Sequence, residues 1–200
     1  MRHTVRVRRS TWLVAPLIAT IILGLSLEGS ARQMRLSDLH DQLVDPFQAA
    51  PDVKVIVFLF ISTDCPISNR YAPELRRLYD KFTSRGVGFW LVYPNQADST
   101  VAIRKHTDAF GYGPSALRDP QQALVKLANV TVTPEAAVFD RRQQLVYRGR
   151  IDNRYVNLGV ERPAPTTHDL EEVLLATLAG QAVAHATAPA VGCFVADFLR

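Results

Sequence analysis

The segment from Val53 to Ile61 constrains the fold of this chain more than any other. It reads VKVIVFLFI, so every residue except Lys54 is β-branched, leucine or phenylalanine. Successive side chains of a strand point to opposite faces of the sheet, and a strand that is apolar at successive positions therefore needs cover on both faces. The segment predicts a central strand of an α/β protein and excludes a half-exposed hairpin strand.

Helical and strand-like segments alternate along the rest of the chain. Leu75, Leu78 and Phe82 lie on one face of a helix predicted over 69–85, which Gly86 ends. The further expected elements are, in chain order, a strand at 87–93, a helix from Asp98 or Ser99 toward Gly111, a short helix at 120–128, a hairpin of strands at 136–140 and 145–149, and a helix over 170–178 introduced by Thr166 or Thr167. Residues 153–166 have no periodicity and are predicted to form a loop.

The charge of the chain is concentrated at its N-terminus. The whole sequence of 200 residues carries a formal net charge of +4, and residues 1–31 hold four arginines against Glu28, which gives that segment +3 and leaves +1 for the rest. A nearly neutral body has no electrostatic reason to bind a polyanion, so no nucleic-acid partner is expected. The length and a hydrophobic content of 48% suit one folded domain.

The N-terminal segment has the layout of a secretory signal. Its basic residues are followed by an apolar run from Trp12 to Leu27 and then by the small residues at 29–31. We expect cleavage after Ala31, with an uncleaved N-terminal membrane anchor as the alternative; both place the body in the periplasm or another extracytoplasmic space. The expected organisation is a leader at 1–31, a folded domain at 32–180 and a C-terminal tail at 181–200.

The chain has two cysteines, Cys65 and Cys193. Cys65 follows the buried strand and opens a helix, where free backbone N–H groups and the helix dipole favour a thiolate. Oxidising compartments let disulfides form and persist, and only one pairing is open to two cysteines. The close cysteine and histidine spacings of a zinc site are absent, so no bound metal is expected.

The segment around Cys65 reads FISTDCPISNRYAPE and carries Pro66 and Pro73, and a Thr133-Pro134 pair precedes the terminal hairpin and helix. This combination resembles the redoxin branch of the thioredoxin superfamily, the alkyl hydroperoxide reductase and thiol-specific antioxidant group, over about residues 35–180. The resemblance implies a thioredoxin-like fold with a central mixed sheet flanked by helices. It also implies that Pro134 is cis beside the nucleophilic sulfur, and that Thr133, Pro134 and Pro66 contact the substrate.

The sequence departs from the related motifs at two positions. Ser68 stands where a thioredoxin-type dithiol has its second cysteine, so another thiol must resolve Cys65, and Cys193 is the internal candidate. Ser62 matches the hydroxyl residue of the peroxiredoxin signature, whereas Phe58 replaces its proline. Peroxide reduction needs a thiolate, a hydroxyl and usually a cation. The candidate cations are Arg70, Arg118 and Arg148.

These features predict an exported thiol oxidoreductase that needs no cofactor. Cys65 attacks a peroxide or a disulfide, and Cys193 or an external thiol resolves the product; the expected electron donor is a protein or a small thiol. Two alternatives stay open. One is a copper-handling protein of the same fold, although Asn69 stands where the Cys-x3-Cys pair of such proteins has its second cysteine. The other is a catalytically silent binding module.

Overall fold

We describe a computed structural model of the protein over residues 34–48 and 52–195. The predicted leader at 1–31 lies outside these residues, and its cleavage stays a prediction. Among the described residues, none of the helices is both long and apolar enough to span a bilayer.

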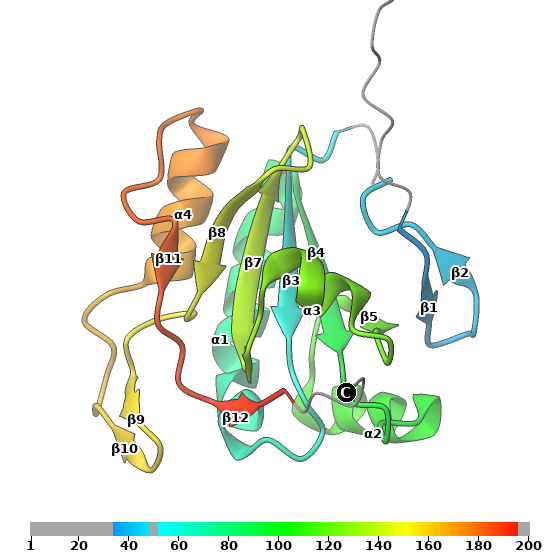
Figure 1. Cartoon of the computed structure of the whole chain (residues 1–200). Helices are drawn as coiled ribbons and strands as arrows, with labels where there is room; N and C mark the ends of the chain where they lie inside the picture. Colours follow the sequence, from blue (N-terminus) through cyan, green and yellow to red (C-terminus); the bar gives the residue numbers. More distant parts are fainter. Residues whose placement is uncertain (1–33, 49–51, 196–200) are drawn as a thin grey trace, which may run out of the picture. The chain divides into compact units, whose positions relative to one another are not determined.

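Eight strands of the described residues form one mixed sheet, in the order β11-β8-β7-β3-β4-β5-β1-β2 (Figure 1). Strand β3 lies at its centre, parallel to β4 and antiparallel to β7. All residues of β3 are buried, which confirms the central strand predicted from the apolar segment. The strands are β1 (Leu36–Asp38), β2 (Leu43–Val44), β3 (Val55–Phe60), β4 (Val87–Tyr93), β5 (Ser115–Arg118), β7 (Glu135–Asp140), β8 (Leu145–Gly149) and β11 (Thr187–Ala188).

Helices cover both faces of this sheet. Side chains of β3 alternate between two apolar clusters: Val57 and Leu59 join one, and Phe58 and Phe60 the other. The first cluster contains side chains of α1 and α4, and the second contains those of α3. The helices are α1 (Pro66–Phe82), followed by a 3-10 turn at Thr83–Arg85, then α2 (Thr100–Phe110), α3 (Ala123–Ala128) and α4 (Asp169–Leu178). The fold is therefore the predicted α/β type.

Most helix ends follow the predicted signals. Gly86 and Gly111 adopt the left-handed conformation where α1 with its 3-10 turn and α2 end, and the Ser99 hydroxyl accepts a hydrogen bond from the Ala102 N–H at the start of α2. The predicted start of the last helix is wrong. His168, and neither Thr166 nor Thr167, is the N-cap of α4. The reason is that the Thr166 hydroxyl accepts a hydrogen bond from Asn153, while the Thr167 hydroxyl bonds the Asp169 carboxylate.

The predicted loop at 153–166 contains a hairpin instead. Strands β9 (Tyr155–Asn157) and β10 (Val160–Glu161) pair antiparallel with an irregular register. Their side chains are exposed apart from Tyr155, so the sequence shows no alternation of buried and exposed positions. Strand β5 was missed as well, because it is a short strand at the end of an apolar-poor segment.

The C-terminal tail returns to the domain at two places. Strand β11 adds parallel to β8, with Ala188 opposite Gly149. The chain then forms β12 (Cys193–Phe194), which pairs antiparallel with β6 (Val132–Thr133) in a separate two-stranded sheet. In Figure 1 this last strand crosses below the ends of β7 and β3. The tail therefore carries Cys193 to the carboxyl end of the central strand.

Candidate active site

Cys65 is the residue from which helix α1 starts. It adopts an extended conformation (φ −85°, ψ 109°), with Pro66 in the first helical position. Proline suits this position because its missing N–H would have no intrahelical partner there. The Cys65 carbonyl accepts the Asn69 N–H at 3.1 Å, and the Cys65 side chain is 0% exposed. The strand-to-helix junction thus fixes the sulfur inside the protein, at the positive end of α1.

The loop that contains Thr133 and Pro134 contacts this sulfur. The peptide bond between the two residues is cis, which confirms the conformation that the resemblance implied. Cys65 Sγ donates a hydrogen bond to the Thr133 carbonyl at 3.0 Å. The structure therefore brings Thr133 and Pro134 beside Cys65, although they lie far apart in the sequence.

The second sulfur reaches the same place from the tail. Cys193 is the register partner of Thr133 in the β12–β6 pair, and the Thr133 hydroxyl lies 3.5 Å from the Cys193 carbonyl oxygen. The two side chains are close enough for each sulfur to shift the pKa of the other, and both cysteines are free thiols. The only two cysteines of the chain thus lie next to the loop that contains the cis peptide bond of Pro134.

The pKa values of the two thiols are shifted in opposite directions. Burial raises the pKa of Cys65, but hydrogen bonds from the Cys193 thiol and from Ser68 outweigh it and bring that pKa below its ordinary value. Burial, together with the hydrogen bond and negative charge of Cys65, raises the pKa of Cys193 to about 12. Of the two coupled thiols, Cys65 is therefore the one that loses its proton first.

Ser68 contributes to this thiolate although sequence reasoning gave it no role. Its side chain is fully buried, and its hydroxyl has no hydrogen-bond partner among the described residues. Both the hydroxyl and the backbone N–H of Ser68 lower the pKa of Cys65. The signal for this contact was its spacing: a residue three positions after the N-cap lies in the first turn and faces the cap.

Ser62, the predicted hydroxyl residue, bonds to a neighbouring side chain. Its hydroxyl donates a short hydrogen bond to the Asp64 carboxylate. The neighbouring Thr63 hydroxyl donates to Asp98 at 2.5 Å, and the other oxygen of Asp98 is buried without a partner. Burial raises the pKa of Asp98. The hydroxyls before Cys65 therefore hold the loop, and the contact to Asp98, 35 positions away, was not foreseen.

The three candidate arginines make their contacts elsewhere. Arg70 pairs with Glu161 at 2.8 Å on the surface. Arg118 donates to the Asp98 carbonyl at 3.1 Å, and Arg148 donates to the Asn129 carbonyl at 2.6 Å. The groups that lower the pKa of Cys65 are the thiol of Cys193, the hydroxyl of Ser68 and the backbones of these two residues. The thiolate is thus stabilised by neutral hydrogen-bond donors.

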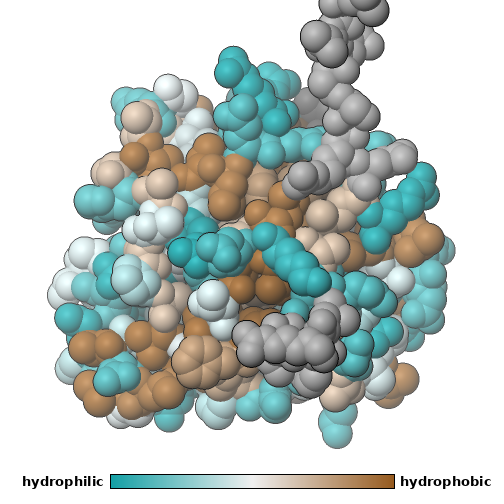
Figure 2. Space-filling model, in the orientation of Figure 1, coloured by the Kyte–Doolittle hydropathy of each residue, from teal (hydrophilic) through white to brown (hydrophobic). Residues whose placement is uncertain are grey.

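Pockets flank Cys193 on two sides. One, of about 490 Å³, lies between the start of α1 and the β9–β10 hairpin and is lined by Pro66, Ile67, Tyr155 and Leu158. The other, of about 160 Å³, is lined by polar groups that include Ser62 and Asp64. Figure 2 shows apolar residues gathered where the hairpin lies, and the exposed apolar side chains of the hairpin are Val156, Leu158 and Val160. Pro66 therefore lines the apolar pocket, as a substrate-contacting residue would.

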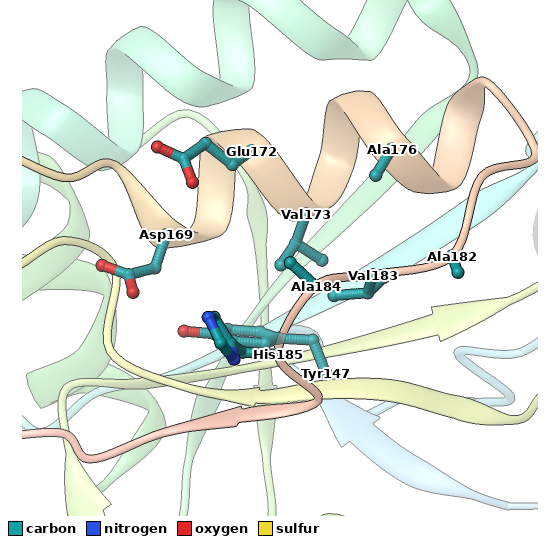
Figure 3. Close-up of a pocket in the computed structure, with 9 residues that line it drawn as sticks. All are labelled: Tyr147, Asp169, Glu172, Val173, Ala176, Ala182, Val183, Ala184 and His185. Atoms are coloured by element: carbon teal, nitrogen blue, oxygen red, sulfur yellow. The ribbon is translucent and has the colours of Figure 1, made fainter.

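A further pocket lies away from the sulfurs, under the tail. It has a volume of about 130 Å³ and separates α4 from the segment 182–185 (Figure 3). Asp169 and Glu172 line it from α4, and the Asp169 carboxylate is bound by Arg150 at 2.9 Å. Val183 packs against the apolar cluster beneath. This pocket marks the path of the tail toward β11.

One group of potential metal ligands occurs in the described part of the chain, and it contains neither cysteine. Glu74, Asp152 and His168 come within 4.8 Å of one another. The carboxylate of Glu74 is already bound in bidentate fashion by Arg77, at 2.7 and 2.8 Å. The copper-handling alternative requires a histidine beside the sulfurs, and no described metal-ligand group supplies one.

The fold and the paired thiols define a thioredoxin-fold redox protein. The sequence model of the Redoxin family matches residues 28–162, and the chain belongs to this family. None of the curated proteins matches the sequence.

Solved structures agree with this fold. An uncharacterized conserved protein from Geobacillus kaustophilus is 26% identical, with a TM-score of 0.73 over 84% of this chain and 89% of that one. A hypothetical protein from Sinorhizobium meliloti is 25% identical, with a TM-score of 0.68 over 81% and 89% of the two chains. A secreted disulfide oxidoreductase of Mycobacterium tuberculosis is 16% identical, with a TM-score of 0.51 over 74% and 96%, and shares the fold.

Proposed function

We propose that this protein catalyses thiol–disulfide exchange, with Cys65 as the nucleophile and Cys193 as the resolving thiol. The observation that carries the proposal is that both cysteines meet at Thr133, beside the cis peptide bond of Pro134: Cys65 Sγ lies 3.0 Å from the Thr133 carbonyl oxygen, and Cys193 is the register partner of Thr133. Disulfide exchange begins with a thiolate, and the lowered pKa of Cys65 favours its formation there. Cys193 thus supplies the second thiol, which is absent at position 68.

The reaction runs in two exchanges. The Cys65 thiolate attacks one sulfur of a substrate disulfide; a mixed disulfide forms, and the other substrate sulfur leaves as a thiolate that takes up a proton. Cys193 then loses its proton and attacks the Cys65 sulfur. The Cys65–Cys193 disulfide forms and the remaining substrate sulfur leaves as a thiolate. Two electrons pass to the substrate, and a thiol donor returns them by the reverse steps.

The pKa of Cys193 fits its place in this order. Part of its rise to about 12 comes from the negative charge of Cys65, after the larger effect of burial. That charge disappears when Cys65 enters the mixed disulfide, so Cys193 becomes easier to deprotonate at the step where its thiolate is needed. The pair therefore keeps Cys193 inactive until the first exchange is complete.

A disulfide suits the site better than a peroxide. Peroxide reduction usually employs a hydroxyl and a cation at the sulfur. Here the Ser62 hydroxyl is bonded to Asp64, and Arg70, the candidate nearest in sequence, is paired with Glu161. Hydrogen peroxide is therefore the comparison oxidant in the test. The signal-like leader supports a site of action outside the cytoplasm, with a protein or small-molecule thiol as the electron donor.

The test is intact mass and thiol titration of the reduced protein after addition of oxidised glutathione or hydrogen peroxide. We expect glutathione disulfide to remove two thiols and about 2 Da, and to do so faster than an equal amount of peroxide. Cys65→Ser should abolish the loss, whereas Cys193→Ser should accumulate a glutathione adduct on Cys65. Phe194→Ala, next to Cys193, is the matched control and should react normally. Two thiols that stay reduced with both oxidants would contradict the proposal.

A further inference from the structure

The apolar cavity beside Cys193 has the size of a small-molecule site. Its volume of about 490 Å³ lies within the range of about 300–1,000 Å³ that is usual for such sites. Helix α1 lines it with Pro66 and Ile67, and the β9–β10 hairpin lines it with Tyr155 and Leu158. Ligand sites combine apolar walls of this kind with a few polar groups that orient the ligand. The polar groups of the cavity therefore indicate what it binds.

Two opposite charges lie side by side in the lining of this cavity. The Arg70 guanidinium lies 2.8 Å from the Glu161 carboxylate, and both residues line the cavity. Their side chains are 62% and 42% exposed, so a ligand from solvent can reach both. An arginine has five N–H donors and a carboxylate has two acceptor oxygens, so the pair keeps groups for a second partner. A ligand that satisfies both charges carries a carboxylate and an ammonium group.

The same cavity places such a ligand within reach of a protein sulfur, because Cys193 is part of its lining. Arg70 follows Cys65 by five positions, and the helical rise puts its backbone about 7.5 Å further along α1. A small molecule held by Arg70 and Glu161 can therefore extend a sulfur of its own along the apolar wall toward Cys193. A carboxylate, an ammonium group and a thiol occur together in low-molecular-weight thiols built on an α-amino acid, of which cysteine is the simplest.

The charged pair also separates a free amino acid thiol from other thiols. A cysteine inside a protein chain has its α-amino and α-carboxyl groups in peptide bonds and carries neither charge there. Cysteamine has the ammonium group without the carboxylate, and 3-mercaptopropionate has the carboxylate without the ammonium group. Each of these two small thiols therefore satisfies one half of the Arg70–Glu161 pair, whereas cysteine satisfies both.

We propose that the cavity binds an α-amino acid thiol, which is the electron donor of the exchange reaction. Arg70 binds the α-carboxylate of the donor, and Glu161 binds its α-ammonium group. Two donor thiols reduce one protein disulfide: the Cys65–Cys193 bond breaks, a disulfide bond forms between the two donor sulfurs, and the two donor protons neutralise the released cysteine thiolates. The inference rests on the proposed function, because thiol–disulfide exchange is the reaction that consumes the donor.

The first test follows reduction of the Cys65–Cys193 disulfide in the full chain by cysteine, cysteamine or 3-mercaptopropionate. Samples are quenched with N-ethylmaleimide, and intact mass counts the thiols. Arg70→Gln should slow reduction by cysteine and by 3-mercaptopropionate about fivefold, and should not slow reduction by cysteamine. Glu161→Gln should slow reduction by cysteine and by cysteamine, and should not slow reduction by 3-mercaptopropionate.

Arg76→Gln is the matched control, because Arg76 is an exposed arginine of the same helix that is not part of the cavity lining. It removes the same charge and should change each of the three rates by less than about twofold. Rates for Arg70→Gln that match those of Arg76→Gln, or equal slowing of all three thiols by Arg70→Gln, would overturn the assignment of the donor and leave the exchange reaction in place.

The second test measures binding without reaction. S-methylcysteine keeps the charged amino acid group and has no thiol, and its titration into the reduced protein is followed by the amide NMR signals of Leu158 and Gly159, which line the cavity. Both signals should shift, and Arg70→Gln should raise the Kd about fivefold. Unshifted signals would overturn the cavity as the donor site. If none of the three thiols reduces the disulfide of the folded protein, the proposed exchange fails and the donor role fails with it, whereas the titration still decides whether the cavity binds the amino acid group.

Discussion

The two cysteines of this protein differ in what holds them. Cys65 lies between the buried strand β3 and the long helix α1, and its sulfur is enclosed by core residues. Cys193 lies on a two-residue strand of the tail, is partly exposed and borders two pockets. The nucleophile is therefore held by the core of the domain, whereas the resolving thiol lies on a short strand of the tail.

The largest effect is expected beneath Cys65. Leu78 of α1 is buried in the cluster that also contains Cys65. Leu78→Ala removes buried methyl groups and leaves a cavity, which should lower the free energy of unfolding by about 2–5 kcal/mol. Urea unfolding followed by circular dichroism measures the change. Leu175→Ala, on the exposed side of α4, is the control and should change it by less than about 0.5 kcal/mol. A loss as small as the control's would show that α1 is not a supporting element of the core.

A smaller effect is expected where the tail is anchored. A Cβ atom at Gly149 would lie 2.2 Å from the Ala188 carbonyl oxygen, in the pairing of β8 with β11. Gly149→Ala should separate β11 from the sheet at a cost of about 1–3 kcal/mol. Alkylation of Cys65 by iodoacetamide, read by mass spectrometry, should then become faster because β12 loses its tether.

Thr187→Ala is the control for that anchor, because the Thr187 side chain is exposed on β11 and the change adds no atoms. It should leave the alkylation rate of Cys65 unchanged. If Gly149→Ala also leaves the alkylation rate unchanged, β11 does not control the position of β12. The difference between core and tail would then concern β12 alone.

The sequence predicted the core side of the comparison better than the tail side. The position of Cys65 follows from local rules, because an apolar segment forms the strand and a proline after the cysteine suits the first turn of a helix. The conformation of Pro134 came from the family resemblance. The meeting of Cys65 and Thr133 depends on the register of β3 with β7, which pairs Phe60 with Glu135 and which no local pattern encodes.

The tail could not be predicted in the same way. Strands β11 and β12 have two residues each, and they form only because β8 and β6 offer free edges. Cys193 was chosen as the candidate resolving thiol because no other cysteine exists, and its placement opposite Thr133 comes from the structure alone. Ser62 shows the opposite case: its type and position matched a motif, but the adjacent Asp64 carboxylate binds its hydroxyl.

Removing the hydrogen-bond donors of Cys65 is expected to change the pKa of this thiol and leave the fold intact. The Cys193 thiol is the strongest of the donors that lower the pKa of Cys65, followed by Ser68. Hydrogen bonds to a charged form stabilise it, so their removal raises the pKa. Cys193→Ala should therefore shift the midpoint of the pH profile for Cys65 alkylation upward, and Ser68→Ala should shift it upward by less.

The profiles are measured with iodoacetamide between pH 5 and about 10, the range that spans ordinary thiol titration. At a fixed pH below the midpoint, the fraction of thiolate falls in both variants, and the alkylation rate falls with it. Ser68→Thr keeps a hydroxyl at the same position and should keep the midpoint low. An unshifted midpoint in Ser68→Ala would remove Ser68 from the set of groups that stabilise Cys65.

The smallest effect is expected at Arg70. An arginine beside a thiolate is a common means of lowering a thiol pKa, but the Arg70 guanidinium is on the surface and pairs with Glu161. Exposed ion pairs are weak because water and salt screen them. Arg70→Ala should therefore leave the pH profile of Cys65 alkylation where it is, with Arg70→Lys as the charge-preserving control. An upward shift in the alanine variant, rescued by lysine, would show that a positive charge acts on Cys65 across the apolar pocket, and the thiolate would then depend on more than its neutral donors.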